Sequence, residues 1–175
     1  MDKAKMIEVG VVMGSDSDWP LLKQTASTLD SFGVGYEVRV ISAHRSPAVA
    51  AAYSSEAAGR GLKVIIAAAG GAAHLAGVLA AHTTLPIIGL PVKGGAMDGL
   101  DALLATVQMP AGIPVGTVAL GSAGSVNAAI LAVQMLALSN PALAQRLVLH
   151  KKSLADKVAA ANDKIQAELN AARPA

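Results

Sequence analysis

A histidine and an arginine stand side by side in the segment Ser42-Ala43-His44-Arg45-Ser46-Pro47. An imidazole in general titrates near neutral pH, so a histidine such as His44 is suited to transferring a proton in either direction. The guanidinium of Arg45 is always charged and offers N–H donors to a carboxylate or phosphate. The pair therefore suits proton transfer on a small anionic ligand.

A strand and a helix are expected to hold this segment. The apolar-rich run 36–41 predicts a β-strand, and Ser46 followed by Pro47 is typical of a helix N-cap and first helical residue. His44 and Arg45 would then lie at the carboxyl end of a strand, above a helix N-terminus. Ligands of open α/β sheets bind at that edge, where helix amides favour anions.

The segment Gly14-Ser15-Asp16-Ser17-Asp18 follows a second β-rich run, residues 7–13. The hydroxyls of Ser15 and Ser17 can donate to a phosphate, and Asp18 can accept hydrogen bonds from ribose hydroxyls. The same side chains would also serve as helix N-caps. The segment matches neither a Walker loop nor a GxGxxG motif, so it does not indicate a nucleoside triphosphate or dinucleotide.

The segment Gly70-Gly71-Ala72-Ala73-His74 follows a third apolar run, residues 63–69. Small residues let backbone amides approach a ligand closely. His74, a polar residue in an apolar stretch, is by itself more typical of a packing histidine than of a catalyst. The histidines lack HxH or HExxH spacing and no serine lies in a GxSxG motif, so metal binding and serine hydrolysis are unsupported.

Predicted strands and helices alternate along the whole chain. Strands are expected at 7–13, 36–41, 63–69, 85–90 and 113–120, and helices at about 19–33, 47–59, 75–82, 98–108, 125–138 and 140–170. This alternation predicts right-handed βαβ units and a three-layer α/β/α sandwich with a parallel sheet of about five strands. We expect a single domain over residues 1–175, with a core at about 7–150 and a helical tail at 151–175.

Composition excludes several classes of function. The 175 residues contain no cysteine, which rules out disulfides and Cys-ligated zinc and favours the cytoplasm. A net charge of +2 and 2% aromatic residues argue against nucleic-acid binding. The uncharged runs 64–92 and 102–145 are long enough for membrane helices, but glycine and proline interrupt both. We therefore expect burial within the fold and no membrane association.

The predicted helix 125–138 has only Ser125, Asn127 and Gln134 as polar residues. A helix that is apolar nearly all round needs burial all round. On the outer layer of a small α/β domain, only another subunit can supply it, so the sequence predicts a homo-oligomer.

Several motifs taken together resemble the class I branch of the PurE family, the N5-carboxyaminoimidazole ribonucleotide mutases of purine biosynthesis. These motifs occur in the family's order and are VVMGSDSDW at 11–19, SAHR at 42–45, GGAAHL at 70–75, QMP at 108–110 and GIPVGT at 112–117. The likeness covers about residues 7–150.

The resemblance implies a flavodoxin-like fold, a homo-octamer with active sites near subunit contacts, and a reaction without cofactor or metal. The family moves a carboxylate from the exocyclic N5 to C4 of the aminoimidazole ribonucleotide, through decarboxylation and recarboxylation with CO2 held in the pocket. His44 matches the proton-transfer histidine, and His74 matches a motif histidine that lines the pocket. The uncharged residues 69–73 would help to exclude water.

The remaining positions of the resemblance concern substrate binding. Arg45 and the hydroxyls of Ser15, Ser17 and Ser42 match the phosphate side, and Asp18 matches the ribose-phosphate side. Further substrate contacts are implied for residues that also lie in the motifs: Ala43, Gly70, Gly71, Ala72, Ala73 and Leu75.

The chain departs from the family pattern at two positions. Ala76 stands where the family usually has proline, and Val78 where methionine is common; the first change is expected to keep the fold but to loosen the turn over the carboxylate.

Two alternative functions are compatible with the residues. One is the class II activity, direct carboxylation of aminoimidazole ribonucleotide with CO2. The other is a non-catalytic flavodoxin-like ligand-binding or signalling module, in which His44 would be dispensable.

Overall fold

Five parallel strands form one sheet in the computed structural model, which describes residues 6–172. The strands are β1 (Ile7–Met13), β2 (Gly35–Val40), β3 (Val64–Gly70), β4 (Ile87–Val92) and β5 (Gly116–Thr117), in the spatial order β2-β1-β3-β4-β5. The order reverses at β1, which lies between β2 and β3. In such sheets the crevice at this reversal is the usual ligand site.

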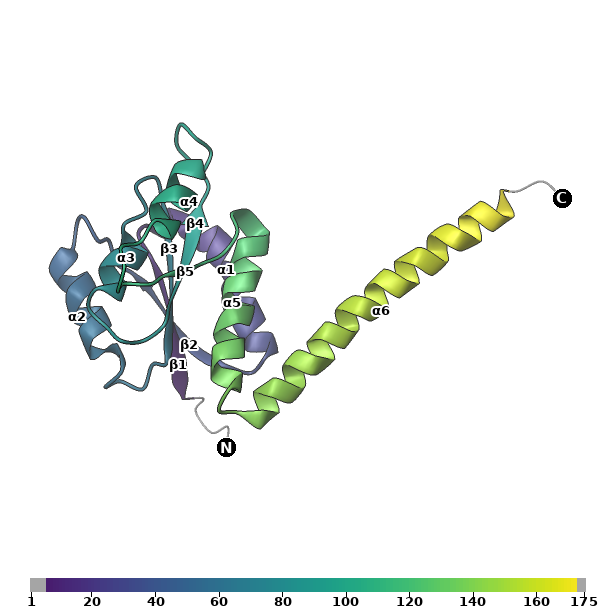
Figure 1. Cartoon of the computed structure of the whole chain (residues 1–175), viewed down its shortest axis with the longest axis horizontal. Helices are drawn as coiled ribbons and strands as arrows, with labels where there is room; N and C mark the ends of the chain where they lie inside the picture. The colour runs from purple at the N-terminus through teal and green to yellow at the C-terminus, as the bar shows by residue number, and fades with distance from the viewer. Residues whose placement is uncertain (1–5, 173–175) are drawn as a thin grey trace. The chain divides into compact units, whose positions relative to one another are not determined.

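Helices cover both faces of the sheet (Figure 1). A short 3₁₀ turn (Asp16–Asp18) leads into α1 (Trp19–Ser31), which shares one face with α5 (Gly121–Ala137). The other face carries α2 (Pro47–Ala57), α3 (Leu75–Ala80) and α4 (Leu100–Val107). The predicted three-layer α/β/α sandwich with a flavodoxin-like sheet is therefore confirmed.

The central strands are apolar on both sides because helices bury both sides. Val11 and Val12 point to opposite faces of β1, and both are fully buried. On the face of α2 and α3, Val12 and Ile65 pack with Tyr53 and Leu79. Within residues 6–172 no helix has the length and apolar character needed to cross a membrane.

The region around β5 differs from the prediction. A strand was expected over 113–120, but only Gly116 and Thr117 pair with β4. Pro114 has no N–H to donate to a ladder, and the preceding chain turns, with the Ile113 N–H donating to the Pro110 carbonyl.

Helix α5 begins at Gly121, four residues earlier than predicted. The predicted loop Gly121–Gly124 forms its first turn instead. A Cβ at Gly124 would overlap the carbonyl oxygen of Ala119, so this glycine permits close packing and does not mark a flexible loop.

The last helix, α6 (Pro141–Ala171), belongs to a separate compact unit that starts at Ala137. It begins where predicted: the Asn140 side chain accepts a hydrogen bond from the Leu143 N–H, and Pro141 is the first helical residue. Large apolar side chains are exposed along it, namely Val148, Leu149, Leu154, Val158, Ile165 and Leu169.

Candidate active site

A cleft of about 400 Å³ lies at the carboxyl ends of β1, β2 and β3. It forms there because β1 lies between the other two strands, so that the loops following all three meet. The residues that line it are Gly14, Ser15, Asp18, Ser42, Ala43, His44, Arg45, Ala69, Gly70, Ala73, His74 and Leu75.

The cleft brings together most of the predicted site residues but not Ser17, Gly71 or Ala72. The Ser17 hydroxyl donates to the Ser15 hydroxyl oxygen at 2.8 Å, so it supports a residue of the wall. Gly71 has a φ of +60° and belongs to the turn in which the Ala73 N–H donates to the Gly70 carbonyl.

Gly14 and Ala69 also line the cleft, although neither was among the predicted contacts. Gly14 belongs to the segment 14–18 and Ala69 to the uncharged residues 69–73, both of which the sequence analysis places at the ligand site.

His44 and His74 are in direct contact across the cleft. His44 Nε2 lies 2.8 Å from His74 Nδ1, and the rings meet edge to face at an interplanar angle of 83°. Only one proton fits between two nitrogens at this distance, so one ring donates and the other accepts. The orientation of each ring is therefore set by the other. Among residues 6–172 no three His, Asp or Glu side chains are grouped so as to hold a metal ion.

Arg45 connects the ends of β1 and β2. Its backbone N–H and its Nε donate to the Ser42 hydroxyl at 3.1 and 3.4 Å, and its Nη2 donates to the Gly14 carbonyl at 2.9 Å. No carboxylate within the described residues 6–172 pairs with this guanidinium. A guanidinium carries five N–H donors, so Arg45 keeps donors for an anion in the cleft.

The hydroxyl of Ser46 stabilises the turn that carries His44, although the sequence predicted that it would cap the helix α2. Ser46 occupies the N-cap position and α2 begins at Pro47, both as predicted, but its hydroxyl caps no amide of α2. Instead the hydroxyl donates to the Ser42 carbonyl at 2.9 Å and accepts from the Ser42 N–H at 3.1 Å. These bonds close a five-residue loop around His44.

The carboxyl group of Asp18 is partly buried, which disfavours its charged form. Burial raises the pKa of its carboxyl above the usual 3.8 and the charge of Asp16 adds to this, while hydrogen bonds with Ser15 and Ser17 partly oppose it. The carboxylate therefore destabilises the fold at pH values above its folded pKa, and the penalty vanishes below pH 3.8, where both states are protonated.

We expect Asp18→Asn to be more stable than the wild type at pH 7, by less than about 1 kcal/mol, or at most about 4 °C in Tm. The gain should shrink as the pH falls through the folded pKa of Asp18. Thermal unfolding at pH 7 and at pH 3 measures it, with Glu56→Gln, an exposed carboxylate on α2, as control. An equal gain at both pH values would contradict the explanation.

A second hollow of about 410 Å³ adjoins the cleft on the other side of His74. Its walls include Gln108 and Met109 from the loop after α4, and Val78, one of the two departures from the family pattern. The other departure, Ala76, is the second residue of α3 and is buried.

Comparisons with known proteins show which family the sequence and the fold resemble. A family model described as AIR carboxylase matches residues 8–157. The chain is 56% identical over 158 residues to the N5-carboxyaminoimidazole ribonucleotide mutase of Mycobacterium tuberculosis, which covers 90% of each chain. It is 57% identical over 133 residues to the mutase of Vibrio cholerae, covering 76% of this chain and 83% of that one. The crystal structure of Treponema denticola PurE superposes with a TM-score of 0.80 at 28% identity, over 89% of this chain and 96% of that chain.

Proposed function

Because the chain belongs to the AIR carboxylase family, we infer that it is an N5-carboxyaminoimidazole ribonucleotide mutase, an isomerase of purine biosynthesis. The observation that carries this function is the 56% identity to a curated mutase over 90% of both chains. The family model extends over residues 8–157, which include almost all of the unit that carries the cleft and the first part of α6.

We propose that His44 moves the proton of this reaction. Loss of CO2 from N5 leaves a nitrogen that needs a proton, and bond formation between C4 and CO2 releases one. The proton gained equals the proton lost, so one acid/base group can serve both steps without a cofactor. His74, 2.8 Å from His44, fixes its tautomer and provides a second place for the proton.

Substrate binding is assigned to the groups around this pair. Arg45 and the hydroxyls of Ser15 and Ser42 face the same cleft and supply hydrogen-bond donors for the phosphate. Asp18 accepts hydrogen bonds from the ribose. The small side chains of Ala69, Gly70 and Ala73 leave an uncharged wall beside His74, which favours holding CO2 without water.

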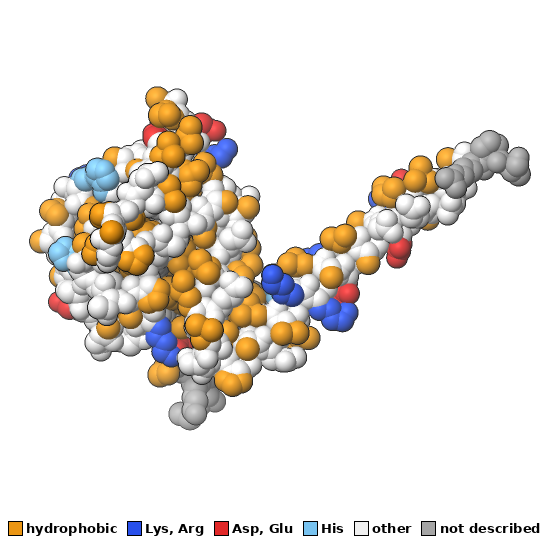
Figure 2. Space-filling view, in the orientation of Figure 1, with side chains coloured by type: hydrophobic (Ala, Val, Ile, Leu, Met, Phe, Trp, Pro, Cys, Tyr) orange, Lys and Arg blue, Asp and Glu red, His pale blue; other side chains and the backbone are white. Residues whose placement is uncertain are grey.

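A homo-octamer is the second part of the proposal. In the single chain His44, Arg45 and His74 are all exposed, which leaves room for a neighbouring subunit to cover the cleft. Helix α5 already buries Ala128, Ala132 and Val133 within its own fold, so less of it remains for a partner subunit to cover than the sequence analysis expected. Apolar side chains remain exposed on and just before α4, where Figure 2 also shows hydrophobic atoms: Met97, Leu100, Leu104 and Val107.

Light scattering at micromolar concentration should give a mass of about 140 kDa, eight times the chain mass of 17.5 kDa. Leu104→Glu, on the exposed side of α4, should lower this mass because it places a charge in an apolar contact. Ser27→Glu, exposed on α1, is the control and should leave it unchanged. A stable, active monomer would overturn the octamer.

An assay of two substrates tests the function itself. The mutase should convert N5-carboxyaminoimidazole ribonucleotide without bicarbonate. A class II carboxylase would instead require aminoimidazole ribonucleotide and bicarbonate, and a non-catalytic module would turn over neither. We further propose that the enzyme works in the cytoplasm and without a cofactor, in keeping with its cysteine-free sequence and the proton balance above.

A further inference from the structure

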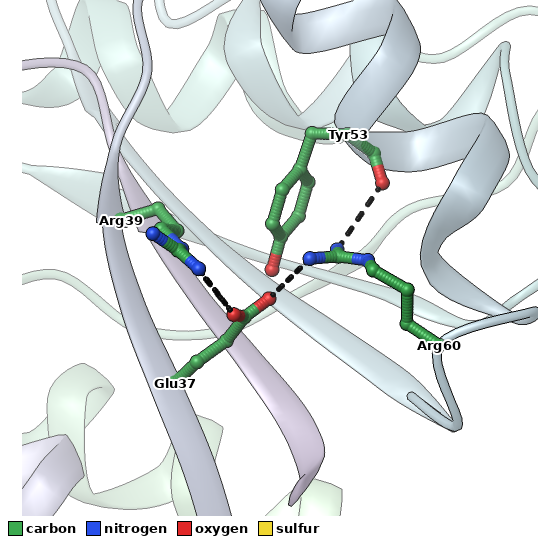
Figure 3. A network of polar contacts seen from close by, with 4 residues as sticks. All are labelled: Glu37, Arg39, Tyr53 and Arg60. Atoms are coloured by element: carbon green, nitrogen blue, oxygen red, sulfur yellow. Dashed lines mark hydrogen bonds and ion pairs between the residues drawn. The ribbon is translucent and has the colours of Figure 1, made fainter.

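The carboxylate of Glu37 lies outside the cleft, on the side of β2 that faces Tyr53 of α2 (Figure 3). The side chain of Glu37 is only 13% exposed and contacts two arginines (Figure 3). Its Oε2 accepts hydrogen bonds from Arg39 Nε at 3.2 Å and Arg39 Nη2 at 3.0 Å. Its Oε1 lies 3.1 Å from Nη1 of Arg60, in the turn that follows α2. A mostly buried carboxylate requires such partners, since burying an unpaired charge is costly.

Tyr53 completes the network from α2. The Arg60 guanidinium lies over its ring, 4.6 Å from the ring centroid, and Arg60 Nη2 donates to the Tyr53 carbonyl at 3.5 Å. The Tyr53 hydroxyl points towards the Glu37 carboxylate (Figure 3). Burial and the charge of Glu37 both raise the pKa of this hydroxyl, so it stays protonated.

Gly10 makes room for this hydroxyl. A Cβ at this position of β1 would overlap the Tyr53 oxygen. The network therefore joins β1, β2, α2 and the turn after α2.

These elements flank the turn that carries the proposed catalytic groups. Strand β2 ends at Val40, the turn Ser42–Ser46 holds His44 and Arg45, and α2 begins at Pro47. Strand β2 is also at the edge of the sheet, so ladder bonds hold it on one side only. The position of α2 against β2 depends on contacts between this strand and the segment that contains α2, and the Glu37–Arg60 ion pair links β2 to the turn that ends this segment.

We propose that Glu37, Arg60 and Tyr53 are positioning residues that set α2 against β2 and so place His44 and Arg45 over the cleft. The proposal rests on the mutase function proposed above. A small displacement of a reacting group can cost a large factor in rate, so a loosened α2 should slow turnover without any contact to the substrate.

Arg60→Met is the first test, because Arg60 is partly exposed and Glu37 keeps its hydrogen bonds to Arg39 when Arg60 is replaced. We expect kcat/KM to fall about tenfold, with contributions from both kcat and KM, because His44 and Arg45 move together. Arg60→Lys keeps the charge and should restore most of the loss. Glu37→Gln, which keeps the shape and removes the charge, should repeat the effect of Arg60→Met.

Lys63→Met is the matched control. Lys63 also pairs with a mostly buried carboxylate, Glu8 at 18% exposure, with 2.6 Å between Nζ and Oε1. That pair joins the beginnings of β1 and β3 and does not flank the turn. Lys63→Met should leave kcat/KM within about twofold of the wild type. This should hold even if Lys63→Met and Arg60→Met lower the free energy of unfolding by similar amounts. Equal losses of kcat/KM in Arg60→Met and Lys63→Met would overturn the positioning role.

The imidazole NMR signals of His44 and His74 give a readout independent of turnover. Arg60→Met should shift these signals, because the ring contact between His44 and His74 changes, and Lys63→Met should not. An inactive wild type in which Arg60→Met shifts the signals and Lys63→Met does not would refute the mutase function and leave the positioning role intact. Unchanged imidazole signals in both Arg60→Met and Glu37→Gln would refute the positioning role, whatever the activity.

Discussion

His44→Asn is expected to lose about 10²- to 10⁴-fold in turnover while it still binds the ribonucleotide. Asparagine cannot exchange a proton near neutral pH, and it removes the Nε2 contact with His74 at 2.8 Å. The cleft and its other donors stay in place, so the ground-state complex should form. Single-turnover kinetics and an independent binding titration would separate the two effects.

His82→Asn serves as the control for this variant, since His82 is exposed and outside the cleft. Unchanged turnover in His44→Asn would refute proton transfer by His44 and favour the non-catalytic module. A loss of affinity equal to the loss of turnover would make His44 a binding residue instead.

Arg45→Ala should weaken ribonucleotide binding about 10- to 150-fold, the equivalent of the roughly 1.5–3 kcal/mol of a hydrogen bond to a charged group. Arg45 faces the cleft without a carboxylate partner among residues 6–172, so its charge is available to the phosphate. Turnover at saturating substrate should fall much less. Calorimetric titration with the ribonucleotide, and with inorganic phosphate as a fragment, measures this loss.

The fold of the Arg45→Ala variant needs a separate check, because Arg45 also donates to the Gly14 carbonyl. Arg45→Lys keeps the charge but loses the planar fork, so it should bind with intermediate affinity. Lys23→Ala, which removes an exposed charge on α1 outside the cleft, is the control for net charge. Normal binding by Arg45→Ala would show that the phosphate lies elsewhere.

The sequence could predict the strands that are buried and the loops that follow them. Runs such as 7–13 and 63–69 are apolar because helices bury both sides of a parallel strand, so composition alone locates β1 and β3. The carboxyl ends of parallel strands meet at one edge, and this placed His44 and His74 in the same cleft.

The features that the sequence could not predict depend on contacts between distant segments. Nothing in the run 113–120 reveals that only Gly116 and Thr117 find a partner in β4. The packing of Gly124 on Ala119 likewise became visible only in three dimensions. Glu37 pairs with Arg60, which is 23 positions away along the chain, and no local sequence pattern indicates this contact.

Because β1 lies between β2 and β3, the ligand site exists only when these three strands are paired, so ligand binding and folding of the sheet are coupled. The walls of the cleft come from segments up to 61 positions apart, from Gly14 to Leu75, and none forms a local pocket by itself. A ligand that needs all three walls binds the folded chain and not the unfolded one. At 100 times its Kd, such a ligand would add about 2.7 kcal/mol to the free energy of unfolding. Substrate supply would thereby protect the enzyme against unfolding as well as set its rate.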